Sequence, residues 1–163
     1  MTVLPFPDLY AGKCIAALDR QHPRDLFDVH QLLNVEGMTI ELRTALIVYL
    51  ISHGRPPHRL LSGKCRDITH DYEHGFQGMT ATDLPIGVLR DAHARLVEDF
   101  VSNMPEAHKV FLYGFFPGAP EWEFLGVPGC EELPAVKWRQ FKLAESREDE
   151  RAEIVERLRE VLG

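Results

Sequence analysis

The sequence lacks several features that would assign it to a class at once. Its three cysteines, Cys14, Cys65 and Cys130, are too few and too scattered for a disulfide framework or a CxxC zinc site. No run of 18 apolar residues is present, so no segment is expected to span a membrane. The first ten residues have no basic segment followed by a long apolar one, which argues against a signal peptide. We therefore expect a cytoplasmic protein with free thiols.

Alternation of apolar and polar residues, which is typical of β-strands, is almost absent from the sequence. No GxGxxG, Walker or GxSxG motif occurs. Apolar residues instead recur at helical spacing, as in residues 42–50 and 88–104. The pattern predicts an all-α protein of six to eight helices, with residues 55–63 as a loop or a short turn of helix. We expect one helical domain over residues 1–163, in which residues 1–36 form two helices and residues 39–163 a bundle. The aromatic side chains, Trp138 among them, are expected to lie mostly in the core.

Charge is distributed unevenly along the chain, whose formal net charge is −7. Residues 1–66 carry eight Lys and Arg against six Asp and Glu, whereas residues 67–163 carry ten against nineteen. The acidic total argues against general affinity for nucleic acids. Residues 53–66, however, hold four Lys and Arg, two His and no acid. This stretch is either a solvated basic loop or a surface that meets phosphates.

The first two expected helices combine charged side chains with apolar faces. Lys13 and Arg20 are seven residues apart and so share one helix face, while Arg24 and Asp28, and Asp25 and Asp28, have neighbour spacings on the next helix. Leucines and valine at positions 26, 29, 32 and 33 mark the buried side of this second helix. The charged groups could neutralise a triphosphate and hold its metal ions, or they could form a salt-bridge lattice between the helices. Spacing alone leaves both interpretations open.

A short histidine-rich segment spells a zinc-protease pattern. His70, Glu73 and His74 fit H-x-x-E-H, in which two histidines on one helix face bind zinc and the glutamate acts as a base. Gly75 follows at once, so a long supporting helix is not expected. No third ligand is indicated by the sequence. A zinc hydrolase is therefore the weakest of the functional hypotheses.

Two segments resemble motifs of a known family. Residues 13–20, KCIAALDR, are similar to K-L-x-A-x-x-x-R, the third motif of the AbiEii nucleotidyltransferase-like toxins, with Cys14 in place of leucine. Residues 24–29, RDLFDV, resemble the family's fourth motif, R-D-L-Y-D-L. Residues 133–138, LPAVKW, also resemble the C-terminal region of the family. The resemblance implies the helical C-terminal part of a polymerase-β-type nucleotidyltransferase, the toxin of a toxin–antitoxin or phage-defence system.

The resemblance also implies roles for the charged residues. Such enzymes transfer a nucleotide from an NTP to an acceptor, which is RNA such as tRNA in some members. By analogy Lys13 contacts the triphosphate, Arg20 and Arg24 bind phosphate or substrate, and Asp25 or Asp28 positions metal, water or a basic partner. Family members hold magnesium on the carboxylates of a G-S-x-x-D head, and only Asp8 precedes Lys13 here. We therefore expect nucleotide or phosphate binding without autonomous transfer, and magnesium only where a head complements the chain.

Several partners follow from this hypothesis. The chain would be a truncated or split toxin that meets an antitoxin or a separate head-domain chain. Without a head, an apolar surface at Val3, Leu4, Phe6 and Leu9 would be exposed or covered by a second copy in a homodimer. The alternative is a stand-alone helical module that binds a protein or RNA partner without catalysis. No membrane is expected to take part.

Overall fold

The computed structural model describes residues 6–163, and this part of the chain is built from helices without any strand. Its nine α-helices are α1 (Phe6–Asp19), α2 (Pro23–Val35), α3 (Ile40–Ser52), α4 (Pro57–Leu60), α5 (Thr69–Gly75), α6 (Ile86–Val97), α7 (Glu106–Phe115), α8 (Pro134–Glu145) and α9 (Glu148–Leu162). A π-helical turn, η1 (Glu98–Ser102), continues α6, and the 3-10 turns η2 (Trp122–Phe124) and η3 (Cys130–Glu132) precede α8. The all-α prediction is confirmed. The additional helix is α4, where the sequence left a loop or a short turn.

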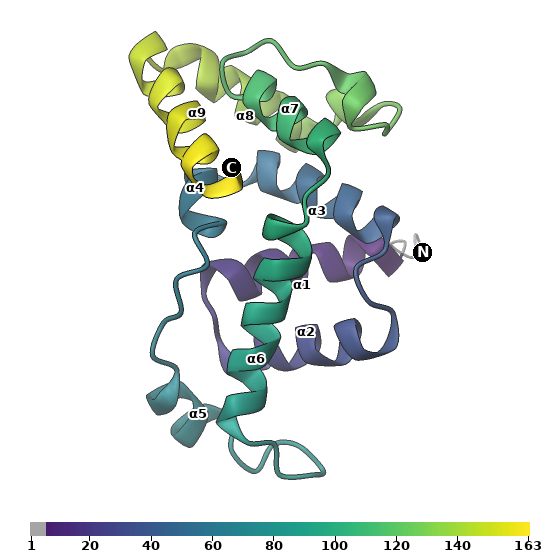
Figure 1. Ribbon diagram of the computed structural model, residues 1–163, viewed down its shortest axis with the longest axis vertical. Coiled ribbons are helices and arrows are strands. Elements are labelled where there is room, and N and C mark those ends of the chain that lie inside the picture. Colours follow the sequence, from purple (N-terminus) through teal and green to yellow (C-terminus); the bar gives the residue numbers. More distant parts are fainter. Residues whose placement is uncertain (1–5) are drawn as a thin grey trace.

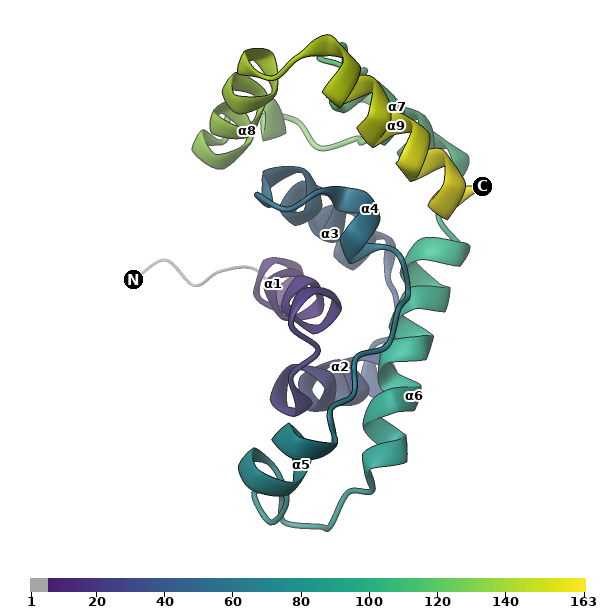
Figure 2. The ribbon, with the colours of Figure 1, turned by 90° about the vertical axis from the view of Figure 1, so that its left-hand side faces the viewer.

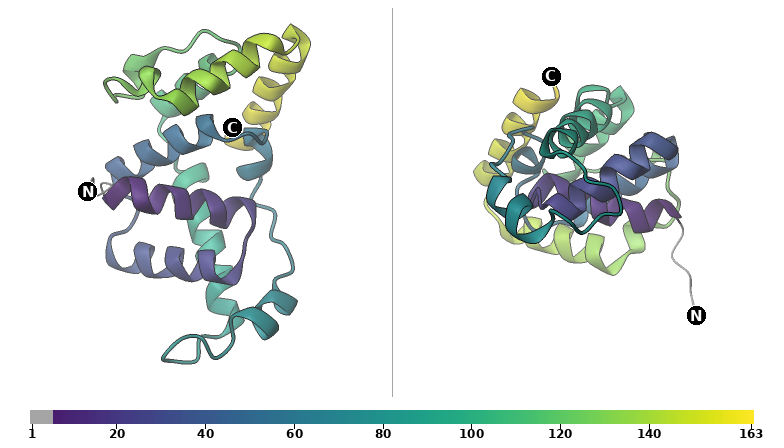
Figure 3. Two further views of the ribbon diagram at one scale, coloured as in Figure 1. Left: turned by 180° about the vertical axis from the view of Figure 1, so that it is seen from behind. Right: turned by 90° about the horizontal axis from the view of Figure 1, so that it is seen from below.

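Three helices stack at the centre of the molecule. Helix α1 lies between α2 and α3, and α6 crosses this stack on one side (Figures 1 and 2). Helices α7, α8 and α9 pack over α3 and α4 at one end, while α5 packs on α2 at the other. Seen from behind, α1 and α2 lie in front of α6 (Figure 3, left). The first two helices therefore pack through one side and expose the other.

One hydrophobic cluster holds these helices together, so the first two helices share their core with the rest. The four apolar residues predicted for the buried side of α2, Leu26, Val29, Leu32 and Leu33, are all buried, and so is Cys14 on α1. Burial raises the pKa of the Cys14 thiol to about 12. The three cysteines are free thiols, as the sequence predicts.

The expectation of a core position fails for Trp138. This residue lies on α8 with 60% of its surface exposed, and its ring stacks on the exposed Phe141 with 5.6 Å between ring centroids. Helix α8 buries Val136 and Leu143 instead. A tryptophan therefore lies on the outer face of α8, because the helix is fastened through smaller side chains.

Arg43 on α3 joins the central stack to the π-helical turn. It is the one buried Lys, Arg, Asp or Glu in the described part of the chain, and its guanidinium donates to the carbonyl oxygens of Asp99 and Phe100, the latter at 3.0 Å. Burial lowers the pKa of Arg43, and the carboxylate of Asp99 opposes this effect. Because a π-helical turn departs from the regular α-helical hydrogen-bond pattern, the arginine supplies donors that the helix does not. No pattern in the sequence indicated this contact.

The structure describes only part of the exposed apolar surface that is predicted at the start of the chain. Val3, Leu4 and the Phe6 side chain lie outside the described residues, whereas Leu9 on α1 is 50% exposed. An apolar cleft lies beside it, between the start of α1, helix α3 and the segment that precedes α8. None of the helices over residues 6–163 is long and apolar enough to cross a membrane.

Candidate functional site

Helices α1 and α2 run antiparallel to each other (Figure 3, left), and charged side chains pair across the seam between them. Lys13 Nζ lies 2.9 Å from Asp28 Oδ2, and each side chain is about one-third exposed. Nearer the turn, Arg20 lies 3.0 Å from Asp25. The pairs are those of a salt-bridge lattice, yet exposed pairs of this kind contribute only about 0–1 kcal/mol. A phosphate could therefore displace Asp28 from Lys13 at little cost to the fold, whereas the Asp25 side chain is only 14% exposed.

The turn between the two helices directs Arg24 outward. His22 accepts a hydrogen bond from the Arg24 N–H at 3.2 Å through Nδ1 and so caps α2, while Pro23 occupies the first helical position. The Arg24 side chain is exposed, and its guanidinium reaches the sulfur of Met79 at 3.3 Å. No carboxylate of residues 6–163 pairs with it, which distinguishes Arg24 from Lys13 and Arg20.

A cleft of about 570 Å³ opens beside this turn. We call it the motif cleft, and its lining consists of Arg20, His22, Arg24, Asp25, Arg66 and Asp71. Arg66, which precedes α5, and Asp71, in the first turn of α5, form an ion pair at 2.5 Å. The cleft thus contains three guanidinium groups and two carboxylates, with Arg24 as the unpaired cation. Such a set suits a ligand that carries several negative charges.

The structure brings together some of the predicted residues and separates others. Arg20, Arg24 and Asp25 line the motif cleft, whereas Lys13 and Asp28 lie farther along the seam and outside its lining. The site prediction from the sequence did not include Arg66 or Asp71. The available signal was the basic stretch that ends at Arg66, but nothing in the sequence indicated that it lies against α1 and α2.

Gln21 fixes that stretch to the end of α1. Its side-chain amide donates to the carbonyl of Lys64 at 2.7 Å and accepts from the N–H of Arg66 at 2.8 Å. Gln21 is also the one non-glycine residue with positive φ in the described part, at 52°. This conformation is uncommon for a residue with a side chain. Here it accompanies the two bonds that place Arg66 against the motif cleft.

We expect Gln21→Ala to loosen residues 64–66 without unfolding the protein. The variant loses two hydrogen bonds to backbone groups and keeps the uncommon φ, so it should lose about 1–2 kcal/mol of stability. Hydrogen exchange of the Arg66 amide should become about fivefold to thirtyfold faster, because a loss of about 1–2 kcal/mol in local opening free energy corresponds to these factors. Gln31→Ala, at an exposed position on α2, is the control and should leave this amide protected. Unchanged exchange at Arg66 in the Gln21 variant would show that the bridge does not hold the segment.

The described residues do not fit a magnesium site. Two-metal nucleotidyl transfer needs carboxylates that converge on the same ions, but Asp25 is held by Arg20 and Asp28 by Lys13. Over residues 6–163, no group of three or more His, Cys, Asp or Glu side chains could hold a metal ion. No step of a reaction can therefore be assigned to a metal on these side chains.

The zinc-protease pattern has no supporting geometry either. Helix α5 is seven residues long, and the rings of His70 and His74 stack with 4.3 Å between their centroids. His74 Nδ1 lies 3.0 Å from the carbonyl oxygen of His70. Among the described residues, no third His, Cys, Asp or Glu side chain joins this pair to form a metal site. Within this short helix, the two histidine rings therefore contact each other.

Comparison with known proteins adds one finding. A family model described as "Nucleotidyl transferase AbiEii toxin, Type IV TA system" matches residues 1–162. No curated protein and no solved structure gives a significant match. The matched region includes both charged helices and every residue that lines the motif cleft.

Proposed function

This chain belongs to the AbiEii family of nucleotidyl transferase toxins of type IV toxin–antitoxin systems, and from that premise we propose that α1 and α2 bind the phosphates of a nucleotide. The triphosphate lies along the seam, with Arg20 and Arg24 at the motif cleft and Lys13 farther along α1. Asp25 and Asp28 hold the basic side chains in place until phosphate displaces them. An antitoxin is the regulatory partner that such a system implies.

The observation that supports this proposal most strongly is the unpaired Arg24. The motif cleft contains three arginines but only two carboxylates, which leaves a net positive charge at the exposed Arg24 guanidinium. Guanidinium groups match phosphate oxygens in geometry, and a phosphate bound there would gain charge-assisted hydrogen bonds. The family's nucleotide chemistry and this local excess of positive charge point to the same type of ligand.

Nucleotide transfer needs more than these helices supply. Because Asp25 and Asp28 are engaged by basic side chains, carboxylates from outside residues 6–163 must hold the metal ions. We propose that a head domain, in the same polypeptide or in a separate chain, provides them. RNA such as tRNA is the acceptor that we propose for the assembled enzyme. By themselves the helices bind nucleotide without turning it over.

We expect the protein to bind a triphosphate in the absence of metal, and to lose affinity when the basic residues are removed. Titration of a fluorescent GTP or ATP analogue measures the dissociation constant. Lys13→Ala and Arg24→Ala should each weaken binding about threefold to tenfold, since a charged hydrogen bond contributes roughly 1 kcal/mol at exposed sites. Arg90→Gln removes an arginine on α6 whose side chain is 51% exposed, outside the motif cleft, and it is the matched control.

Three results would count against this proposal. Wild-type protein that binds no triphosphate would contradict it directly. An Arg90→Gln variant that weakens binding as much as Arg24→Ala would show only a general charge effect. Robust transfer of labelled nucleotide to RNA by the protein alone, abolished in Lys13→Ala, would disprove the claim that external carboxylates are needed.

A further inference from the structure

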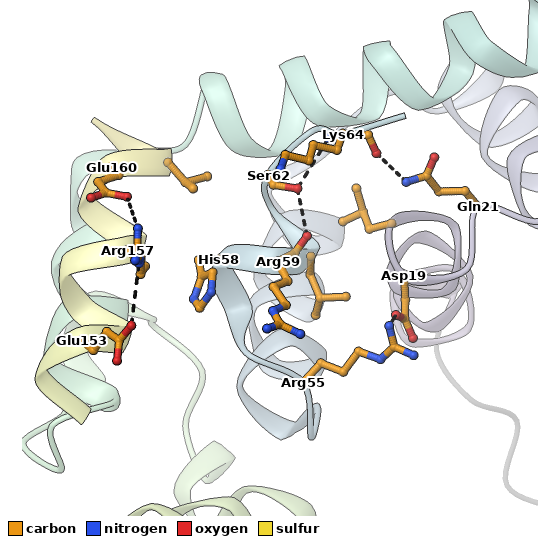
Figure 4. Close-up of a pocket in the computed structure, with 13 residues that line it drawn as sticks. Asp19, Gln21, Arg55, His58, Arg59, Ser62, Lys64, Glu153, Arg157 and Glu160 are labelled. Carbon is orange, nitrogen blue, oxygen red and sulfur yellow. Dashed lines mark hydrogen bonds and ion pairs between the residues drawn. The ribbon is translucent and has the colours of Figure 1, made fainter. Parts of the chain in front are cut away.

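A second cleft is lined in part by Gln21, whose chain neighbours Arg20 and His22 line the motif cleft. Its volume is about 720 Å³, and it separates α4 and the following segment from α9 (Figure 4). On the α4 side it is lined by Asp19, Arg55, Arg59 and Lys64. We call this the α4–α9 cleft. It contains most of the basic stretch that the sequence left either as a solvated loop or as a phosphate surface.

The α4 side of this cleft carries uncompensated positive charge. Arg55 lies 2.8 Å from Asp19, and the two charges offset each other. The side chains of Arg59 and Lys64 are exposed, and no carboxylate of residues 6–163 lies within ion-pair distance of them. The facing wall differs, because Arg157 on α9 lies between Glu153 and Glu160 at 3.9 and 3.4 Å (Figure 4). A negatively charged ligand would therefore lie along the α4 wall.

The two clefts are connected through the residues that Gln21 fastens. Its side chain holds the backbone of Lys64 and Arg66, so that Lys64 lines the α4–α9 cleft and Arg66 lines the motif cleft. Apart from the α9 wall, the two linings contain six arginines and lysines and three aspartates. This strip has a net charge of +3 in a chain whose net charge is −7. With the α9 wall included, the two linings still have a net charge of +2, and the cations without an ion-pair partner among the described residues, Arg24, Arg59 and Lys64, are spread over both clefts.

We propose that the α4–α9 cleft binds the phosphodiester backbone of a single-stranded polynucleotide acceptor, whose end then reaches the nucleotide in the motif cleft. This inference rests on the proposed function, because the motif cleft must hold the nucleotide. Separate cations spaced along a groove are the usual means of following a polynucleotide backbone. A protein partner would instead need an exposed apolar anchor, whereas Leu18 and Leu60 in the lining are buried and Val161 is half-buried.

The test is direct binding of a labelled oligonucleotide of about a dozen nucleotides, followed by fluorescence anisotropy at several salt concentrations. Arg59→Gln/Lys64→Gln should bind at least tenfold more weakly than the wild type. The plot of log affinity against log salt concentration should become shallower, with the magnitude of its slope smaller by about 1.4, because two phosphate contacts are lost on a single strand. Binding of the triphosphate analogue should not change. Arg90→Gln, which removes an exposed arginine outside both clefts, should leave both affinities unchanged.

The two proposals fail in different ways. If the wild type binds triphosphate but no oligonucleotide, or if the double variant binds oligonucleotide normally, this inference is overturned and the nucleotide site stands. If the double variant loses both ligands equally, there is no separate polynucleotide site. If the wild type binds neither ligand, the proposed function fails as well. RNA and DNA of one sequence provide two arms: equal binding supports recognition of the backbone alone, and preference for RNA supports an RNA acceptor.

Discussion

Replacing Arg43 with methionine should destabilise the protein by about 3 kcal/mol, because two buried carbonyl oxygens lose their donor. These are the carbonyls of Asp99 and Phe100 at the π-helical turn after α6. For a chain of this size the melting temperature should fall by about 6–12 °C. Chemical denaturation followed by circular dichroism measures the free energy of unfolding.

Two further variants make the Arg43 test specific. Arg43→Lys keeps a positive charge but has fewer donors in a different geometry, so it should lie between the wild type and Arg43→Met. Arg90→Met changes an exposed arginine on α6 and should alter the free energy of unfolding by less than about 0.5 kcal/mol. A methionine at position 43 that leaves stability within that limit would show that the guanidinium is not needed at the turn.

Removing both carboxylates of the α1–α2 seam should strengthen metal-free triphosphate binding by at least about tenfold. In Asp25→Asn/Asp28→Asn, Lys13 and Arg20 lose their partners, and two negative charges no longer repel the ligand. Each repulsion is worth about 1 kcal/mol at 4 Å even in water, and a triphosphate carries several charges. The fluorescent-analogue titration measures this gain. The effect should shrink as salt is added, because exposed charges are screened.

The same double variant separates a phosphate site from a purely structural lattice. Its stability should fall by no more than about 2 kcal/mol, because two partly exposed ion pairs are lost. If the pairs serve only to fasten α1 to α2, stability falls and triphosphate affinity does not rise. Glu41→Gln, an exposed carboxylate at the start of α3, is the matched control and should change neither quantity measurably. Weaker triphosphate binding in the double variant would contradict the proposed roles of Asp25 and Asp28.

Within single helices the sequence was a sufficient guide. Apolar periodicity identified the buried side of α2 and the helical stretch at residues 88–104, most of which lies in α6 and the π-helical turn. These features depend on residues within one or two helical turns. The two charged motifs also indicated the family, and a family model that matches residues 1–162 bears out this family membership. Burial was less predictable where packing has alternatives, as the exposed Trp138 on α8 demonstrates.

The charged site depended on contacts between distant segments. Helical spacing suggested neighbours within α2, such as Arg24 and Asp28, but the structure pairs Lys13 with Asp28 and Arg20 with Asp25 across two helices. Which cations remain unpaired was decided by the turn at Gln21 and by the segment that this residue holds. The sequence by itself therefore determined the helices, the family and which basic residues are present. Only the tertiary structure decided which of them face a cleft without a partner, because pairing depends on distances between side chains that sequence spacing does not set.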